Sequence, residues 1–296
     1  MYPDRLEKEK KHPHWSVDDI FGGSKGPVRG FVQRDYRIGM HEQDFYEIHI
    51  VLGGHGEHYI GERHTPVREG DVFIIPPNVS HGYEGGVGFD VYHIVLRPGF
   101  LEKNSSELQS LPHFSALFRT EPFMRERTAA RLHLHLDRDE LFALRPRLDE
   151  LAGRSGNDAP HDIILSSCNA LMVISSLCTA YDGRLCGGAG EDEQFARSLS
   201  YIYENYGGRI LVSELSRIAG MSRTAYIEKF KEITGKTPGA FIALHRVMAA
   251  RELIVSTSEP IEDISVRVGF YDASHLTRTF LKHIGKTPSE LRKSLK

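Results

Sequence analysis

Residues 221–238 read MSRTAYIEKFKEITGKTP, and residues 270–288 read FYDASHLTRTFLKHIGKTP. The two stretches share GKTP at an offset of 50 residues, and the same offset aligns Phe230 with Phe280. Neither GKT is a phosphate-binding loop, because phenylalanine stands at both positions where that motif needs a glycine five residues earlier. Similarity at a fixed interval instead indicates a supersecondary unit that occurs twice in the chain.

Each copy has the pattern of a helix, a turn and a second helix. In the first copy Leu215 and Ala219 lie on one apolar helix face, and Gly220 then suits a chain that leaves a helix with positive φ. Ser222 can accept amide hydrogens at the start of the next helix. Residues 238–257 predict one long helix that connects the copies.

The two copies resemble the DNA-binding part of the AraC/XylS family of bacterial transcription regulators. The resemblance covers about residues 192–296 and is most specific in ELSRIAGMSRTAYIEKFKEITGKTP and DISVRVGFYDASHLTRTFLKHIGKTPSELRK. It implies an all-α domain with two helix-turn-helix units, whose recognition helices enter successive major grooves of double-stranded DNA. The two-domain architecture makes RNA polymerase a candidate partner.

Helical periodicity separates the faces of the two expected recognition helices. If Tyr226 and Phe230 point inward in the first helix, and Leu276 and Phe280 in the second, the outward residues are the candidate DNA contacts. The candidate base-reading residues are Arg223, Thr224, Ile227, Glu228, Ser274, His275, Thr277 and Arg278. The candidate phosphate contacts are Lys229, Lys231, Lys282, Lys286 and Arg292.

The family resemblance narrows this set to the positions that read bases in the family. These positions are Thr224, Glu228, Ser274 and Arg278. Arg278 is the strongest candidate, because arginine can bind guanine through two hydrogen bonds. Glu228 stands where a basic residue is often found, and its carboxylate repels phosphate, so we expect the first helix to contribute less affinity.

From Gly30 to Pro98 the sequence consists of short β-rich runs separated by Gly and Pro. Such punctuation predicts a β-sandwich or barrel. HEQDFYEIHIVLGGHG and GDVFIIPPNVSH resemble the effector-binding arm of the same family, which implies a cupin jelly roll (a double-stranded β-helix) that binds a small effector such as a sugar. The candidate pocket residues are His41, Gln43, Glu47, His49, His81 and His93.

Three interpretations of this pocket stay open: a site for a small organic ligand, a metal site, or core histidines without a ligand. The metal positions of enzymatic cupins correspond here to His41, Gln43, Glu47 and His81, and glutamine is a weak ligand. His49 shares a strand face with Glu47, so His41, Glu47, His49 and His81 are a candidate set for zinc or a similar ion. The alternative functions are a metal-sensing regulator and a metal-dependent cupin enzyme. The glutamine and the duplicated units argue against an enzyme.

Residues 137–182 predict an antiparallel helix pair, which the resemblance implies to be a homodimer interface; packing against the barrel is the alternative. Residues 183–193, GRLCGGAGEDE, are the expected linker. The domains are therefore 1–136 for the cupin-like part and 194–296 for the DNA-binding part.

Charge is distributed unevenly along the 296 residues, whose formal net charge is −3. Residues 195–296 hold 16 Lys and Arg against 10 Asp and Glu, a charge of +6, which leaves −9 on the remainder. A basic part suits a polyanionic partner. Three cysteines without zinc-module spacing, and an N-terminus without an apolar run, predict a cytoplasmic protein. The apolar stretch 162–181 contains Asp162 and Asn169 and predicts a buried helix rather than a membrane span.

Overall fold

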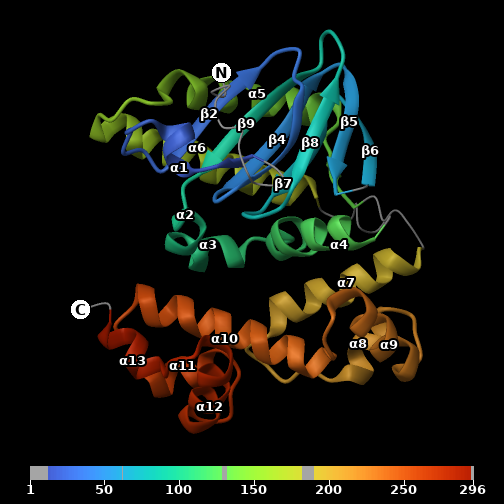
Figure 1. Cartoon of the computed structure of the whole chain (residues 1–296), viewed down its shortest axis with the longest axis vertical. Helices are drawn as coiled ribbons and strands as arrows, with labels where there is room; N and C mark the ends of the chain where they lie inside the picture. The colour runs from blue at the N-terminus through green and yellow to red at the C-terminus, as the bar shows by residue number, and fades with distance from the viewer. Residues whose placement is uncertain (1–12, 62, 129–131, 182–189, 295–296) are drawn as a thin grey trace. The chain divides into compact units, whose positions relative to one another are not determined.

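Two compact units make up the structure, Met1–Leu185 and Cys186–Lys296 (Figure 1). The computed structural model describes residues 13–61, 63–128, 132–181 and 190–294. The linker expected at 183–193 lies outside the described residues as far as residue 189. Its last three residues open helix α7 (Glu191–Asn205).

The first unit contains two five-stranded sheets, with strand orders β1-β3-β8-β5-β6 and β10-β7-β4-β9-β2. Neighbouring strands pair antiparallel, whereas β1 and β3 pair in parallel. The elements are β1 (His14–Trp15), α1 (Val17–Phe21), β2 (Val28–Gln33), β3 (Ile38–Gln43), β4 (Tyr46–Gly53), β5 (His55–Ile60), β6 (Arg63–Arg68), β7 (Asp71–Ile75), β8 (His81–Gly85), β9 (Asp90–Leu96) and β10 (Leu134–His135). This topology confirms the predicted jelly roll.

Strand β4 lies at the centre of its sheet and is buried on both faces. Ile48 and Ile50 alternate with Glu47, His49 and Val51, so the two sets face opposite sides. Val51 belongs to the apolar core between the two sheets. Glu47 and His49 therefore point into the interior of the barrel, beside that core.

Helices α5 (Arg138–Arg154) and α6 (Pro160–Ala180) lie across the outer face of the sheet that contains β4 (Figure 1). Helix α5 lies close to strand β2 at Gly30. A Cβ added to Gly30 would lie 2.7 Å from Leu151 Cγ of α5, so this position requires glycine. Ser155, just after α5, bonds both the amide and the carbonyl of Gly30 at 2.7 Å. The predicted helix pair is confirmed.

Helix α6 has the length and composition of a membrane span. In the structure it has two different faces: Val173 and Leu177 are buried in the first unit, whereas Ile164 and Met172 are exposed. The apolar character of α6 therefore serves packing on one side and leaves an apolar surface on the other.

Short helical segments after β9 were not predicted from the sequence. They are α2 (Phe100–Lys103), α3 (Ser105–Ser110), the π-helix η1 (Ala116–Thr120) and α4 (Glu121–Arg127). Arg125 of α4 is buried, with its Nε 2.9 Å from Glu121 Oε1, and it donates a hydrogen bond to the carbonyl of Ile74. The hydrogen bond to Ile74 holds α4 against strand β7.

The second unit is helical and contains both predicted helix-turn-helix repeats. Its helices are α7, α8 (Val212–Ile218), α9 (Arg223–Thr234), α10 (Pro238–Ser256), α11 (Ile261–Arg267), α12 (Ala273–Ile284) and α13 (Pro288–Lys293). Ser222 caps α9 and Asp272 caps α12, each through a side-chain oxygen that accepts a backbone amide hydrogen. Gly235 and Gly285 end these helices with φ of 69° and 77°, in the left-handed region that favours glycine. Helix α10 joins the repeats, as predicted.

Candidate functional site

The recognition helix of the first repeat, α9, has a buried and an exposed face. Tyr226 and Phe230 are fully buried, and Tyr226 Oη lies 3.0 Å from Ser198 Oγ of α7. The opposite face carries Arg223, Thr224 and Glu228, which are exposed, and Ile227, which is half-buried. The four candidate base-reading residues of this helix therefore share its outer side.

The recognition helix of the second repeat, α12, has the same pattern. Leu276 and Phe280 are fully buried in a core that α10 and α11 complete. The outer side carries Ser274, His275 and Arg278, which are exposed, and Thr277, which is half-buried. Tyr271, immediately before the helix, is 90% exposed. An aromatic ring held beside a recognition helix is a further candidate contact, which the helical pattern could not reveal because Tyr271 precedes the helix.

The five candidate phosphate contacts differ in their surroundings. Lys231, Lys282 and Lys286 are exposed, and Arg292 is partly buried. Lys229 has only 18% of its side chain exposed, and its Nζ lies 3.1 Å from Glu191 and 2.9 Å from Asp192. Lys229 therefore links α9 to the start of α7, and two carboxylates already neutralise its charge.

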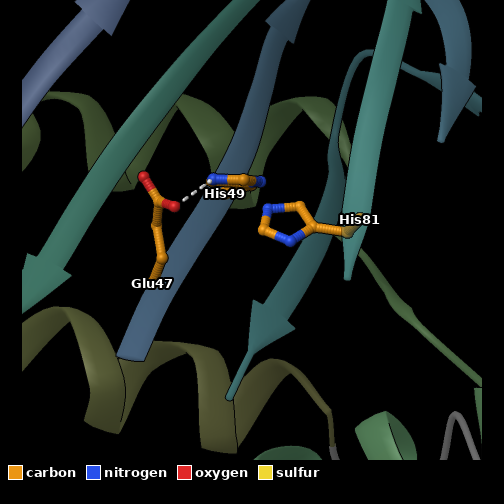
Figure 2. Close-up of side chains that lie close together, drawn as sticks. All are labelled: Glu47, His49 and His81. Atoms are coloured by element: carbon orange, nitrogen blue, oxygen red, sulfur yellow. Dashed lines mark ion pairs between the residues drawn. The ribbon is translucent and has the colours of Figure 1, made fainter. Parts of the chain in front are cut away.

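The barrel interior gathers all six candidate pocket residues, and Glu47 is at their centre. Its Oε1 lies 2.9 Å from His93 Nδ1, and its Oε2 lies 3.1 Å from His49 Nε2. The Gln43 amide donates to Oε2 at 3.3 Å. On the facing sheet, the ring of His81 approaches these groups, as Figure 2 shows for Glu47, His49 and His81.

In His41, His49 and His81, Nδ1 has a partner that orients the ring. His81 Nδ1 lies 3.1 Å from the carbonyl of Val79, and His41 Nδ1 lies 3.0 Å from the carbonyl of Gly39. His49 Nδ1 lies 2.9 Å from the hydroxyl of Tyr83. A carbonyl only accepts hydrogen bonds, so His41 and His81 carry a proton on Nδ1 and a lone pair on Nε2.

Burial determines the protonation of the cluster. It lowers the pKa of His81 well below its ordinary value, with further lowering by His41 and His49. It also lowers the pKa of His41 and brings the pKa of His93 to about 4. Burial by itself raises the pKa of Glu47, but the facing His49 and His93 lower it well below its usual range. Near pH 7, His41, His81 and His93 are therefore neutral, and Glu47 is ionised.

Two family models match the chain over both of these sites. A model of a helix-turn-helix domain matches residues 215–294, and a model of an AraC-like ligand binding domain matches residues 26–168. The chain belongs to the AraC/XylS family. It is a transcription regulator with a ligand-binding domain, and it binds double-stranded DNA.

Relatives of this AraC-type regulator align over most of their length. The Msm operon regulatory protein of Streptococcus mutans is 23% identical over 277 residues, which cover 88% of this chain and 89% of that protein. The transcriptional activator RhaS of Pectobacterium atrosepticum is 23% identical over 256 residues, covering 85% and 86%. A solved AraC-type regulator from Chromobacterium violaceum is 26% identical, covers 36% of this chain and 96% of that one, and has a TM-score of 0.34.

The structure adds residues to the AraC-type barrel cluster that the sequence motifs did not identify. His58 of β5 is fully buried, its ring stacks on Tyr83 at 4.4 Å between centroids, and neither ring nitrogen has a hydrogen-bond partner among the described residues. Tyr36 packs its ring 4.8 Å from that of His93. The alternation of β5 marks His58 and Ile60 as one face, but only the pairing of His58 with Tyr83 on β8 shows that this face is the interior.

Proposed function

We propose that a small effector binds among the buried polar side chains of the barrel and controls how the regulator engages DNA. The observation that carries this proposal is the concentration of six buried polar residues inside the ligand-binding domain. Buried polar groups are normally hydrogen-bonded. In the described part of the chain, Gln43 Oε1 and His81 Nε2 have no hydrogen-bond partner, so both can serve a ligand.

Control would operate through a shift in population. A ligand that binds one arrangement of the protein more tightly than another increases the share of the first arrangement. The arrangements relevant here differ in how two second units of a dimer are presented to operator half-sites or to RNA polymerase. We place this activity in the cytoplasm, where the operator is accessible.

For DNA reading, we assign the exposed sides of α9 and α12 to the major groove. Arg278 is the residue for guanine, and Thr224 and Ser274 provide hydroxyl contacts on the two helices. Glu228 can accept a hydrogen bond from a cytosine amine. The exposed Lys231, Lys282 and Lys286 are the phosphate contacts that we propose.

A second copy of the chain is the partner that we propose for the outer surface of the helix pair. Phe142 of α5 is 76% exposed and Ile164 of α6 is 62% exposed. A groove between the helices is lined on one side by Leu136, Ala143 and Leu144 with Glu140 and Arg147, and on the other by residues 175–177, 179 and 180. The family resemblance, which implies dimer helices at this point of the chain, supports this proposal.

The test measures DNA affinity with the full-length protein and an operator obtained by selection from random DNA. A thermal-shift panel of sugars, organic acids and divalent metal ions identifies the effector by a stabilisation that grows with its concentration. Fluorescence anisotropy and footprinting are then repeated with and without it. The proposal is wrong if a saturating effector changes neither affinity, footprint nor transcription.

A further inference from the structure

We infer that the barrel cluster is a transition-metal site in which Glu47, His49 and His81 are ligands and His41 completes the set. One ligand atom from each of the first three residues lies within 4.8 Å of the others, and all three side chains are buried (Figure 2). This inference deepens the proposed function and depends on it only in giving the metal a role as effector or as part of the effector site.

The histidines are oriented as metal ligands. A metal-bound histidine usually donates its other N–H to a carbonyl, carboxylate or hydroxyl group, which fixes the ring and the tautomer. His81 and His41 do so through the carbonyls of Val79 and Gly39. His49 has the hydroxyl of Tyr83 at 2.9 Å from its Nδ1. In His41 and His81 this leaves Nε2 as the nitrogen available for an ion, and the Nε2 of His49 is directed to Glu47 Oε2 at 3.1 Å.

Glu47 is held so that one oxygen is directed to the same place. His93 donates to Oε1 at 2.9 Å. Oε2 lies 3.1 Å from His49 Nε2, yet within the described residues His49 Nε2 has no partner in hydrogen-bond geometry. The two atoms form an ion pair in this structure, so a carboxylate oxygen and an imidazole nitrogen already converge where one ion would take both as ligands.

Gln43 explains why the ligand set departs from the pattern of enzymatic cupins. Its amide donates to Glu47 Oε2 at 3.3 Å, so it orients the carboxylate rather than offering a strong donor to a metal. His49 supplies the missing imidazole from the strand face that already holds Glu47. The set of three imidazoles and one carboxylate matches zinc and neighbouring first-row ions.

The packing of the interior favours an ion over a larger organic molecule. The rings of His41 and His81 lie 4.3 Å apart, and those of His49 and His93 lie 4.5 Å apart. These are contact distances for stacked or tilted rings, so the side chains themselves fill the space. A sugar would have to displace rings, whereas an ion needs only a small convergence of Nε2 and Oε2 atoms, to about 2.0–2.2 Å from the metal.

The test uses the untagged full-length protein, stripped with a chelator and dialysed against Zn²⁺ or Co²⁺. We expect about one Zn²⁺ per chain by elemental analysis and, with Co²⁺, the visible absorption of nitrogen and oxygen ligation. His81→Gln and Glu47→Gln should each lower Zn²⁺ affinity more than about 100-fold, beyond the loss typical of an outer partner. His55→Gln, an exposed histidine of the same domain, is the matched control and should bind like the parent protein.

A rescue experiment separates ligation from folding. His49→Gln should lose the metal, and Gln43→His in that background should restore it. The second change supplies an imidazole from strand β3, in the sheet that faces His49. Circular dichroism and DNA affinity report whether each variant is folded. Reloaded parent protein that holds no more zinc than His81→Gln, or full zinc binding by His81→Gln, overturns the inference. A metal that binds without changing DNA affinity would leave the site standing and contradict the proposed effector control, whereas control by an organic ligand alone would do the reverse.

Discussion

Glu228 of α9 and Arg278 of α12 lie fifty residues apart at equivalent positions of the two repeats, and both side chains are exposed. The same place on two similar helices therefore has opposite charges. Because phosphate dominates affinity for DNA, an acidic side chain weakens binding and a basic one strengthens it. The two repeats should consequently contribute unequally to operator binding.

Replacing Arg278 tests the stronger of the two helices. Arg278→Ala should cost about 1–3 kcal/mol of operator affinity and relax the sequence preference at one base pair, because a bidentate contact to guanine is lost. Selection from random DNA with both proteins measures the preference. An unchanged preference at every position would contradict the assignment. Arg278→Lys is the electrostatic control, because lysine keeps the positive charge but cannot form the two parallel hydrogen bonds of the guanidinium.

Replacing Glu228 should have the opposite effect on affinity. Glu228→Gln removes a charge that repels phosphate, so binding to operator and to random DNA should both become tighter. Discrimination between them should fall at the position that the carboxylate reads. Titrations on both DNAs at matched salt concentrations decide the question, since weaker binding to random DNA would show that the carboxylate does not face the backbone.

Replacement of Lys282 and of Lys229 should have different effects on DNA binding, because two carboxylates already hold the ammonium of Lys229. Lys282→Ala should reduce the slope of log affinity against log salt by about one, as expected for loss of one phosphate contact. Lys229→Ala should leave that slope unchanged, because Glu191 and Asp192 already neutralise its ammonium. It should instead lower stability by about 1 kcal/mol or less, the usual range for partly exposed ion pairs. A reduced salt slope for Lys229→Ala would show instead that Lys229 contacts a phosphate.

His58 should make the first unit sensitive to acid. Burial lowers its pKa well below the ordinary 6.5, and the charge of Arg125 lowers it further. The unfolded chain therefore binds a proton below about pH 6.5 that the folded chain does not, and stability falls as pH falls. His58→Phe keeps a ring against Tyr83 and should reduce this loss between about pH 7 and pH 5. Urea unfolding at several pH values measures the free energy of unfolding of both proteins. The same dependence of this free energy on pH in the parent and in His58→Phe would refute the prediction.

Phe142 tests the proposed dimer. Phe142→Asp places a charge on the outer side of α5 and should convert a dimer to a monomer at micromolar concentration, with little effect on the stability of the monomer because the side chain is 76% exposed. Sedimentation or light scattering gives the mass. Val87→Asp, also exposed but in the turn between β8 and β9, is the control. An unaltered mass for Phe142→Asp would assign the interface elsewhere.

The helix-turn-helix repeats were predictable because their information is local. Tyr226 and Phe230 are four residues apart on one helix face, and the offset of 50 residues aligns them with Leu276 and Phe280. All four side chains are buried. Caps and terminal glycines then mark the ends of the same helices. The exposed side, which carries the candidate base-reading residues, follows directly from the buried side.

The barrel was only partly predictable, because its site depends on which strands face each other. His41, Glu47 and His81 follow from known spacing, but His58 enters the cluster only through the pairing of β5 with β8. The segment that contains α4 was missed for a different reason. Arg125 and Glu121 look like solvated charges in a sequence, and only tertiary packing shows that they form a buried pair.

The closed interior of the barrel has a consequence for timing. His41, Glu47, His49 and His81 have at most 2% of their surface exposed, so whatever they bind can enter or leave only when strands or side chains move apart. Dissociation would then be limited by the rate of that opening, which is a property of the fold, rather than by bond strength at the site alone. Such a regulator would lose a bound ligand only as fast as its barrel opens, so where opening is slow its response would outlast the stimulus.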